Sequence, residues 1–169
     1  IGVVVGLRPR WTARVQPLAQ FLAAFPANLL FPFAVFLIVR FRLSPALWLS
    51  GLMILGTQWY ILFNVIAGAS AYPSDLREAA ASLRVRASRW WRDVMLPGVF
   101  PYYVTGAITA AGGAWNASIV AETVSWGNTR ISGSGLGAYI TARTLAGDYP
   151  HIALGVAAMS IIVIATNVL

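Results

Sequence analysis

The sequence predicts an all-α integral membrane protein, a bundle of several transmembrane helices, and three observations support this fold class. Of the 169 residues, 59% are hydrophobic and 10% are charged, whereas a soluble domain carries about 25% charged residues. The mean hydropathy is +0.72. The charged residues are grouped so that they separate four uncharged runs, and each run reaches the roughly 20 residues that a helix needs to cross a bilayer.

These four runs give the expected elements in chain order. A segment in lipid must satisfy its own backbone hydrogen bonds, so each run is expected to be helical. The expected spans of one transmembrane domain over residues 1–169 lie at about 17–40, 45–71, 97–121 and 150–169. Residues 1–7 are uncharged and apolar, and we interpret them as the tail of a preceding span. The chain is therefore expected to begin inside a larger polypeptide.

Proline and glycine positions refine three of these spans. Pro26 and Pro32 predict a kinked or broken first span, because proline removes a backbone donor from a helix interior. Pro45 suits the first helical position of the second span. In the third span, small residues recur near one face and allow a neighbouring helix to approach closely. These residues are Gly106, Ala110, Gly113 and Ala117.

The basic residues indicate a membrane surface as the partner. All twelve are arginine, against five acids, and the net charge is +7. In a soluble protein this balance would suggest nucleic acid, but here the arginines lie between apolar runs, so no nucleic acid is expected. Eight arginines fall in residues 8–14 and 75–93, which share one side of the membrane if the first two spans form a hairpin. The positive-inside rule then places these segments in the cytoplasm and residues 123–148 on the opposite side of the membrane.

Residues 74–96 form a charged loop between the second and third spans. Ser74 is expected to cap its first helix and Ser88 to cap a second short helix. An apolar stripe recurs in this loop at helical spacing. Its members are Leu76, Ala79, Ala80, Leu83 and Ala87. A stripe made mostly of alanine is shallow and can fit into a groove on another protein. The residues alone leave a second interpretation equally open, an amphipathic helix on anionic lipid with Trp and Arg as anchors.

A motif in this loop favours the protein partner. Glu78-Ala79-Ala80 opens the motif and Val94-Met95-Leu96-Pro97 closes it. The spacing resembles the EAA loop of bacterial ABC importer permeases, whose pattern has glycine at the position of Arg84 and isoleucine at that of Val94. From about Pro17 to its end, the chain resembles the nitrate, sulfonate, taurine and bicarbonate branch of that family. It is most similar to the double-length members, in which two permease halves are fused.

The resemblance implies a permease core of five helices and a set of docking residues. In that family the EAA loop is the coupling helix, which sits in a cleft of the ATP-hydrolysing subunit. The residues to which this role is carried over are Glu78, Ala79, Ala80, Leu83, Arg84, Leu96 and Pro97.

The resemblance also implies partners and a mechanism. The partners are ATP-binding cassette subunits, a second permease half (fused or separate), a periplasmic or lipid-anchored solute-binding protein, and membrane lipid. The chain is then the membrane-spanning half of an ATP-driven importer of a small anion, working by alternating access. It is not itself an enzyme and holds no cofactor, since ATP and Mg²⁺ belong to the partner ATPase.

Three polar residues at the outer end of the third span are candidates for the translocation pathway: Asn116, Ser118 and Glu122. An ionisable group at the membrane is by default a candidate functional site. For Glu122 we favour the alternative of an ion pair with Arg130 or Arg143. Asn116 and Ser118 can donate hydrogen bonds in a cavity or equally tie helices together.

The outer loop is rich in glycine. Its glycines are Gly127, Gly133, Gly135, Gly137 and Gly147. They lack the lysine and the strand context of a phosphate-binding loop, so we expect turns leading into a short helix at about 135–146. His151 stands alone and is expected to be an interface residue. With no cysteine, no lysine, and no nucleophile beside a base, the sequence predicts neither a catalytic nor a metal site.

Two functions from other classes stay open at this point. One is a membrane scaffold or receptor whose basic loop binds lipid, and the other is an ion-driven secondary transporter. Neither gives a reason for the spacing between Glu78-Ala79-Ala80 and Leu96-Pro97.

Overall fold

The computed structural model describes residues 1–126 and 128–168. Gly127 of the outer loop and Leu169, the last residue of the fourth expected span, therefore lie outside the described residues. The chain divides into two compact units, one made of Ile1–Ala24 and Trp59–Thr109 and the other of Phe25–Gln58 and Ala110–Leu169. Helices α4 (Pro45–Ser70) and α7 (Leu96–Ala121) are each divided between the two units.

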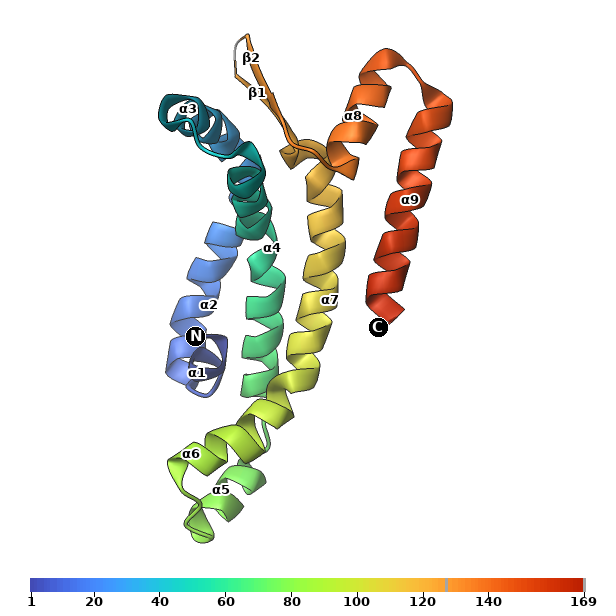
Figure 1. The fold of residues 1–169 in the computed structure, drawn as a ribbon. Helices are drawn as coiled ribbons and strands as arrows, with labels where there is room; N and C mark the ends of the chain where they lie inside the picture. The colour runs from blue at the N-terminus through green and yellow to red at the C-terminus, as the bar shows by residue number, and fades with distance from the viewer. Residues whose placement is uncertain (127, 169) are drawn as a thin grey trace. The chain divides into compact units, whose positions relative to one another are not determined.

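The first unit contains the charged loop. Besides the halves of α4 and α7, its elements are α1 (Gly2–Gly6), α2 (Pro9–Ala24), α5 (Ser74–Ser82), α6 (Ala87–Arg89) and the π-helical segment η2 (Trp90–Met95). Helices α5 and α6 form the loop between α4 and α7 (Figure 1).

The second unit contains the outer loop and the C-terminal helix. Its elements are η1 (Ala27–Leu30), α3 (Phe31–Phe41), β1 (Thr123–Trp126), β2 (Thr129–Ser132), α8 (Leu136–Ala146) and α9 (Tyr149–Val168), with the other halves of α4 and α7. Helices α8 and α9 pack side by side (Figure 1).

Three helices in the described chain have the length and composition to cross a membrane: Leu47–Ser70, Ala87–Ala121 and Tyr149–Asn167. At most 22% of the apolar window of each helix is buried inside the chain. Large apolar side chains such as Phe21, Phe33 and Ile161 are between 66% and 74% exposed. The fold class predicted from composition, a helical membrane protein, is confirmed.

The first expected span, residues 17–40, is divided between α2 and α3. Helix α2 ends at Ala24, one residue before the Phe25-Pro26 pair. Proline disfavours helical geometry in the residue before it and donates no hydrogen bond, so the helix stops here. Pro32 lies in the first turn of α3, where a missing N–H costs nothing. The 16 residues of α2 and the 11 of α3 are each shorter than a complete crossing.

The outer loop contains a β-hairpin, which corrects the expectation of turns alone before the short helix. Strands β1 and β2 pair antiparallel from Thr123 opposite Ser132 to Trp126 opposite Thr129. The Gly133 N–H donates to the carbonyl oxygen of Glu122 at 2.7 Å and closes the base of the hairpin. A Gly-Asn pair between two short runs rich in β-branched residues is the sequence signal for such a hairpin.

Small residues set the helix packing of the first unit. A Cβ atom on Gly6 of α1 would lie 2.6 Å from the Ile66 carbonyl oxygen of α4, and one on Gly106 of α7 would lie 2.9 Å from Ile61 Cα. The close approach predicted for the small face of the third span is thus confirmed at Gly106. Ser70 Oγ also donates to the Gly6 carbonyl oxygen at 3.1 Å, so α1 is held against α4.

The second unit has its own apolar core. Its buried members come from α3, from the first half of α4 and from β1: Ala34, Val35, Ile38, Leu49, Leu52 and Val124. Val35 is 1% exposed and Val124 is 2% exposed. The hairpin is therefore anchored through Val124 of β1, and Ile131 of β2 packs against the same core.

Candidate functional site

The charged loop begins with helix α5, and its start differs from the expected one. Pro73 is the N-cap residue, and Ser74 is already helical, with its hydroxyl directed to Asp75 Oδ1 at 3.2 Å. The expected Ser74 cap is therefore wrong. Pro73 holds an extended backbone (φ −58°, ψ 130°) and takes the cap position itself. Asp75 in the first turn complements the helix dipole.

Helix α5 ends in a left-handed turn at Arg84. The Val85 N–H donates to the Ala80 carbonyl oxygen and the Arg84 N–H to that of Ala81, each at 3.0 Å. With Arg84 at φ +50°, these two bonds make a Schellman motif, which usually carries glycine at this position. The family glycine at the position of Arg84 thus has a structural reason. This chain makes the same turn with a side chain that has a Cβ and is strained there.

The predicted stripe on α5 divides into an exposed and a buried part. Leu76 is 49% exposed and Leu83 is 77% exposed. Glu78 and Ala79 are exposed as well. Ala80, by contrast, is only 8% exposed and faces a small open groove that Val85 and Trp90 also line. Ala80 therefore packs within the loop, and the face open to a partner is Leu76, Ala79 and Leu83.

The second half of the loop leads without a break into the membrane helix. Ser88 is not a cap, since Arg86 holds that position and Ser88 lies inside α6. The helical backbone continues from Ala87 through η2 and α7. Pro97 interrupts no helix in this chain, because the backbone before it changes to π-helical bonding, an adjustment that compensates for a missing donor. Leu96 is 54% exposed at the start of α7.

A contact of Tyr72 with Val94 and Gly98 joins the two ends of the loop and forms a clamp that no sequence pattern predicts. Tyr72, just after α4, donates from its hydroxyl to the Val94 carbonyl oxygen at 3.3 Å. A Cβ atom on Gly98 would lie 2.5 Å from the Tyr72 ring, so only glycine leaves room for the ring. Met95, with no exposed surface, lies in the cluster beside them.

The two tryptophans of the loop belong to this same cluster. Trp90 and Trp91 are partly buried against the core of Ala69, Met95 and Val99. Their ring centroids are 5.2 Å apart in an edge-to-face arrangement. This packing favours a structural role for both rings over the lipid-anchor interpretation of the loop.

Glu122 holds the start of α8, which corrects the expected ion pair with Arg130 or Arg143. Its Oε2 accepts the Ala138 N–H at 2.9 Å. The carboxylate thereby satisfies a free donor of the first helical turn and complements the helix dipole. A Cβ on Gly135 would collide with this carboxylate. Glycine at that position therefore leaves room for the Glu122 carboxylate.

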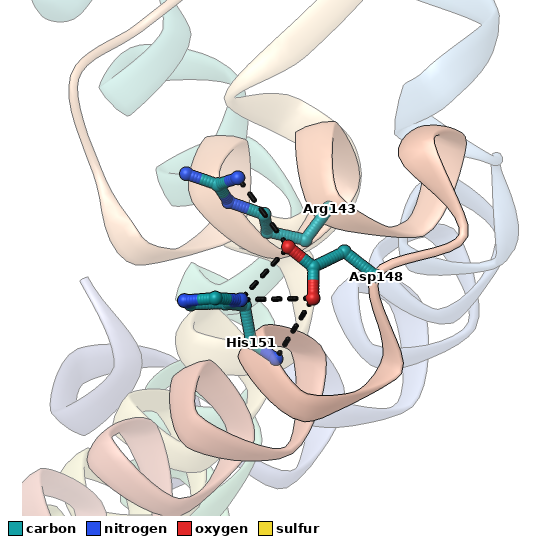
Figure 2. Close-up of polar contacts among 3 residues, drawn as sticks. All are labelled: Arg143, Asp148 and His151. Atoms are coloured by element: carbon teal, nitrogen blue, oxygen red, sulfur yellow. Dashed lines mark hydrogen bonds and ion pairs between the residues drawn. The ribbon is translucent and has the colours of Figure 1, made fainter.

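Arg143 instead belongs to a cluster at the junction of α8 and α9. Arg143 and His151 converge on the carboxylate of Asp148 (Figure 2). Arg143 Nη1 lies 3.5 Å from Asp148 Oδ2, and His151 Nδ1 lies 2.8 Å from both carboxylate oxygens. The hydrogen bond from His151 is the main cause that lowers the pKa of Asp148 from its ordinary value. His151, expected at an interface, thus fixes the first turn of α9.

The two remaining pathway candidates are separated by their surroundings. Ser118 is 4% exposed and donates to the Trp115 carbonyl oxygen of its own helix at 2.8 Å. Gly137 of α8 lies directly against the Ser118 backbone, so this part of α7 serves helix packing. Asn116 is exposed and lines an open groove of about 380 Å³ between α7 and α9. In residues 1–126 and 128–168, no group of three His, Cys, Asp or Glu side chains is placed to hold a metal ion.

Comparison with known proteins agrees with the resemblance carried by the loop motif. The family model described as "Binding-protein-dependent transport system inner membrane component" matches residues 1–169. The bicarbonate transport system permease protein CmpB of Synechococcus elongatus is 33% identical over 127 residues, which cover 75% of this chain and 44% of that protein. The nitrate import permease protein NrtB of Leptolyngbya laminosa is 24% identical over 169 residues, 100% of this chain and 57% of that protein. The chain spans about half the length of the curated relatives it matches.

Proposed function

The chain belongs to the family of binding-protein-dependent transport system inner membrane components, and from this premise we propose that it is the membrane-spanning part of an ATP-driven importer. Hydrolysis takes place in a separate nucleotide-binding subunit, and this chain does no chemistry. Its role is to convert a movement of the charged loop into a change of access to the solute, with two conformations whose balance the nucleotide shifts. The protein then lies in a bacterial inner membrane with several crossings.

The exposed face of α5 is the observation that supports this proposal. Leu76, Ala79 and Leu83 present an apolar face within an otherwise charged loop. An apolar face that stays open in an aqueous loop indicates a protein partner. The shallow relief of Ala79 between two leucines suits the groove of a nucleotide-binding subunit. The neighbouring Glu78 and Arg84 are also exposed.

The ends of the loop are fixed, so a force on α5 reaches the membrane helices. Tyr72 is bonded to Val94 and packed on Gly98, which ties the end of α4 to the start of α7. Beyond Met95 the backbone continues as α7 through Leu96 and Pro97. We assign these two residues to the membrane return of the loop, where they carry the movement into the third span.

The solute is proposed to be a small anion of the bicarbonate and nitrate type, because the relatives named for these solutes are similar over most of the chain. A solute-binding protein outside, periplasmic or lipid-anchored, delivers it. A second permease half, fused or separate, completes the pathway. Of the three pathway candidates, we retain Asn116, whose amide is exposed in a groove, and assign Ser118 and Glu122 to helix packing and helix capping.

The test is a charge placed on the exposed face of α5 in the full-length protein. Leu83→Glu is expected to lower co-purification of the nucleotide-binding subunit, or solute uptake per ATP hydrolysed, by at least about tenfold, because a carboxylate would be buried unpaired in an apolar contact. Ala81→Glu is the matched control, since it adds the same charge to an exposed neighbour that lies about 160° around the helix from Leu83. Normal assembly and normal uptake with Leu83→Glu would remove the docking role.

A further inference from the structure

A second basic cluster lies outside the charged loop, where α1 passes into α2. An open depression of about 530 Å³ is lined there by Leu7, Arg8, Pro9, Arg10, Trp11 and Arg14. The three arginines are exposed. Over residues 1–126 and 128–168, every ion pair uses the carboxylate of Asp148, so none of these guanidinium groups has an acidic partner in the described chain.

The backbone around the cluster is firmly held. Trp11 and Thr12 both donate their N–H groups to the Arg8 carbonyl oxygen, at 2.8 and 3.0 Å. The Thr12 hydroxyl donates to the Val5 carbonyl oxygen at 2.9 Å. The guanidinium carbon of Arg8 lies 5.3 Å from the centroid of the Trp11 ring, a distance typical of a cation–π contact. Three like charges are thus kept close together on a fixed turn, an arrangement that an external anion stabilises.

The surface that adjoins the cluster identifies the kind of anion. Farther along α2, Leu18, Phe21 and Leu22 are 58%, 74% and 48% exposed. Seven residues of helix separate Arg14 from Phe21, a rise of about 10 Å. The headgroup layer on each side of the hydrocarbon core is about 5–8 Å thick, so a headgroup contact at Arg14 places Phe21 among the acyl chains. Trp11, 50% exposed beside the arginines, is a residue type enriched at that boundary.

We propose that Arg8, Arg10 and Arg14, together with Trp11, form a binding site for the phosphate headgroup of an anionic phospholipid. The guanidinium groups donate to the phosphate oxygens, where planar donors give strong charge-assisted bonds. The exposed apolar side chains of α2 contact the acyl chains of the same leaflet. An acidic segment of a partner protein would satisfy the charges, but it would leave this adjoining apolar surface unexplained.

The experiment compares lipid retention by the full-length protein and two variants. The protein is reconstituted in nanodiscs that contain equal amounts of phosphatidylglycerol and phosphatidylcholine, released into detergent, and examined by native mass spectrometry for bound lipid. Each arginine near an anionic surface contributes about a fivefold factor in affinity, so the double variant Arg10→Gln/Arg14→Gln is expected to bind phosphatidylglycerol roughly 30-fold more weakly. Arg10→Lys/Arg14→Lys keeps the charges and is expected to retain most of the binding, which separates lost charge from lost folding.

Arg40→Gln/Arg130→Gln is the matched control, because it removes two exposed arginines from the other unit, and it is expected to retain the lipid. Unchanged retention of phosphatidylglycerol in Arg10→Gln/Arg14→Gln would overturn the proposal. Displacement of the lipid by millimolar inorganic phosphate would also overturn it, because that result indicates a site for a soluble anion. So would loss of the nucleotide-binding subunit from Arg10→Gln/Arg14→Gln in lipid-free detergent, because that result indicates a protein-binding site. Lipid binding is measured without nucleotide or solute, so its outcome is independent of the proposed transport function.

Discussion

Replacing Arg84 by glycine is expected to stabilise the turn that ends α5. Arg84 has φ +50°, and a residue with a Cβ atom loses roughly 1–2 kcal/mol in the left-handed region. Glycine avoids this strain but has more conformational freedom to lose on folding, about 0.5–1 kcal/mol. The expected net gain is therefore about 0.5–1 kcal/mol. The Arg84 side chain is exposed and takes part in no hydrogen bond or ion pair of the described chain, so its removal costs little.

Hydrogen exchange measures this gain at the bonds that define the turn. The Val85 N–H, bonded to the Ala80 carbonyl oxygen, is expected to exchange about two- to fivefold more slowly in Arg84→Gly, which is the factor that corresponds to this energy. Arg86→Gly is the control. Arg86 is extended at φ −60°, where glycine relieves no strain and is expected to speed exchange slightly. Exchange at Val85 that is equal or faster in Arg84→Gly would refute the reasoning.

Three further predictions concern the clamp and the outer loop. Gly98→Leu is expected to displace the Tyr72 ring and destabilise the protein by about 1–3 kcal/mol, which would lower its melting temperature in detergent. Gly56→Leu is the control and should melt like the parent, because no atom lies within 4 Å of a Cβ at that position. Equal melting temperatures of the two variants would contradict the packing of Tyr72 on Gly98. Glu122→Gln is expected to weaken the start of α8 by about 0.5 kcal/mol, because the amide still accepts the Ala138 N–H but the charge is lost; unchanged exchange at that N–H would refute this. Because the pKa of folded Asp148 lies below its ordinary value, its carboxylate stabilises the protein above the unfolded pKa, and this stabilisation is lost as pH falls through the folded pKa. An NMR titration should show this lowered pKa and its rise in His151→Ala; an ordinary pKa in the parent would contradict the cluster.

Patterns that depend on neighbouring residues were predictable from the sequence. Uncharged length predicted spans at about 45–71, 97–121 and 150–169, because a bilayer imposes both helix and length. The helices Leu47–Ser70, Ala87–Ala121 and Tyr149–Asn167 largely agree, except that the second of them begins ten residues before its expected span, inside the charged loop. The motif around Glu78 located the loop, and the small residue at Gly106 indicated a close helix contact that the structure contains. Comparison with known proteins supports the family that the motif suggested.

Features that depend on contacts between distant residues were not predictable in this way. Helical spacing placed Ala80 on the exposed stripe, but in the folded loop Ala80 is buried and lines a groove together with Val85 and Trp90. Likewise, charge alone suggested that Glu122 pairs with an arginine. In the folded chain the nearest donor is the backbone N–H of Ala138, and no periodicity in the sequence signals a contact of that kind.

The predicted N-cap residues of α5 and α6 were wrong, and the reason lies in the residues directly before each helix. Ser74 and Ser88 have the side chains that favour N-cap positions, yet Pro73 and Arg86 occupy them. An extended backbone before the first helical residue is what defines the cap, and proline supplies it directly. Helix boundaries shift by one or two residues when such a neighbour is present.

Accessibility of single cysteines on α5 tests the docking role most directly, since this chain contains no cysteine of its own. In an otherwise cysteine-free full-length protein, Leu83→Cys is expected to react rapidly with a water-soluble maleimide from the cytoplasmic side and to be protected at least about tenfold when the nucleotide-binding subunit is bound. Ala81→Cys, an exposed position about 160° around the helix from Leu83, should react alike in both states. Labelling of Leu83→Cys from the periplasmic side, or labelling that the bound subunit does not slow, would contradict the account.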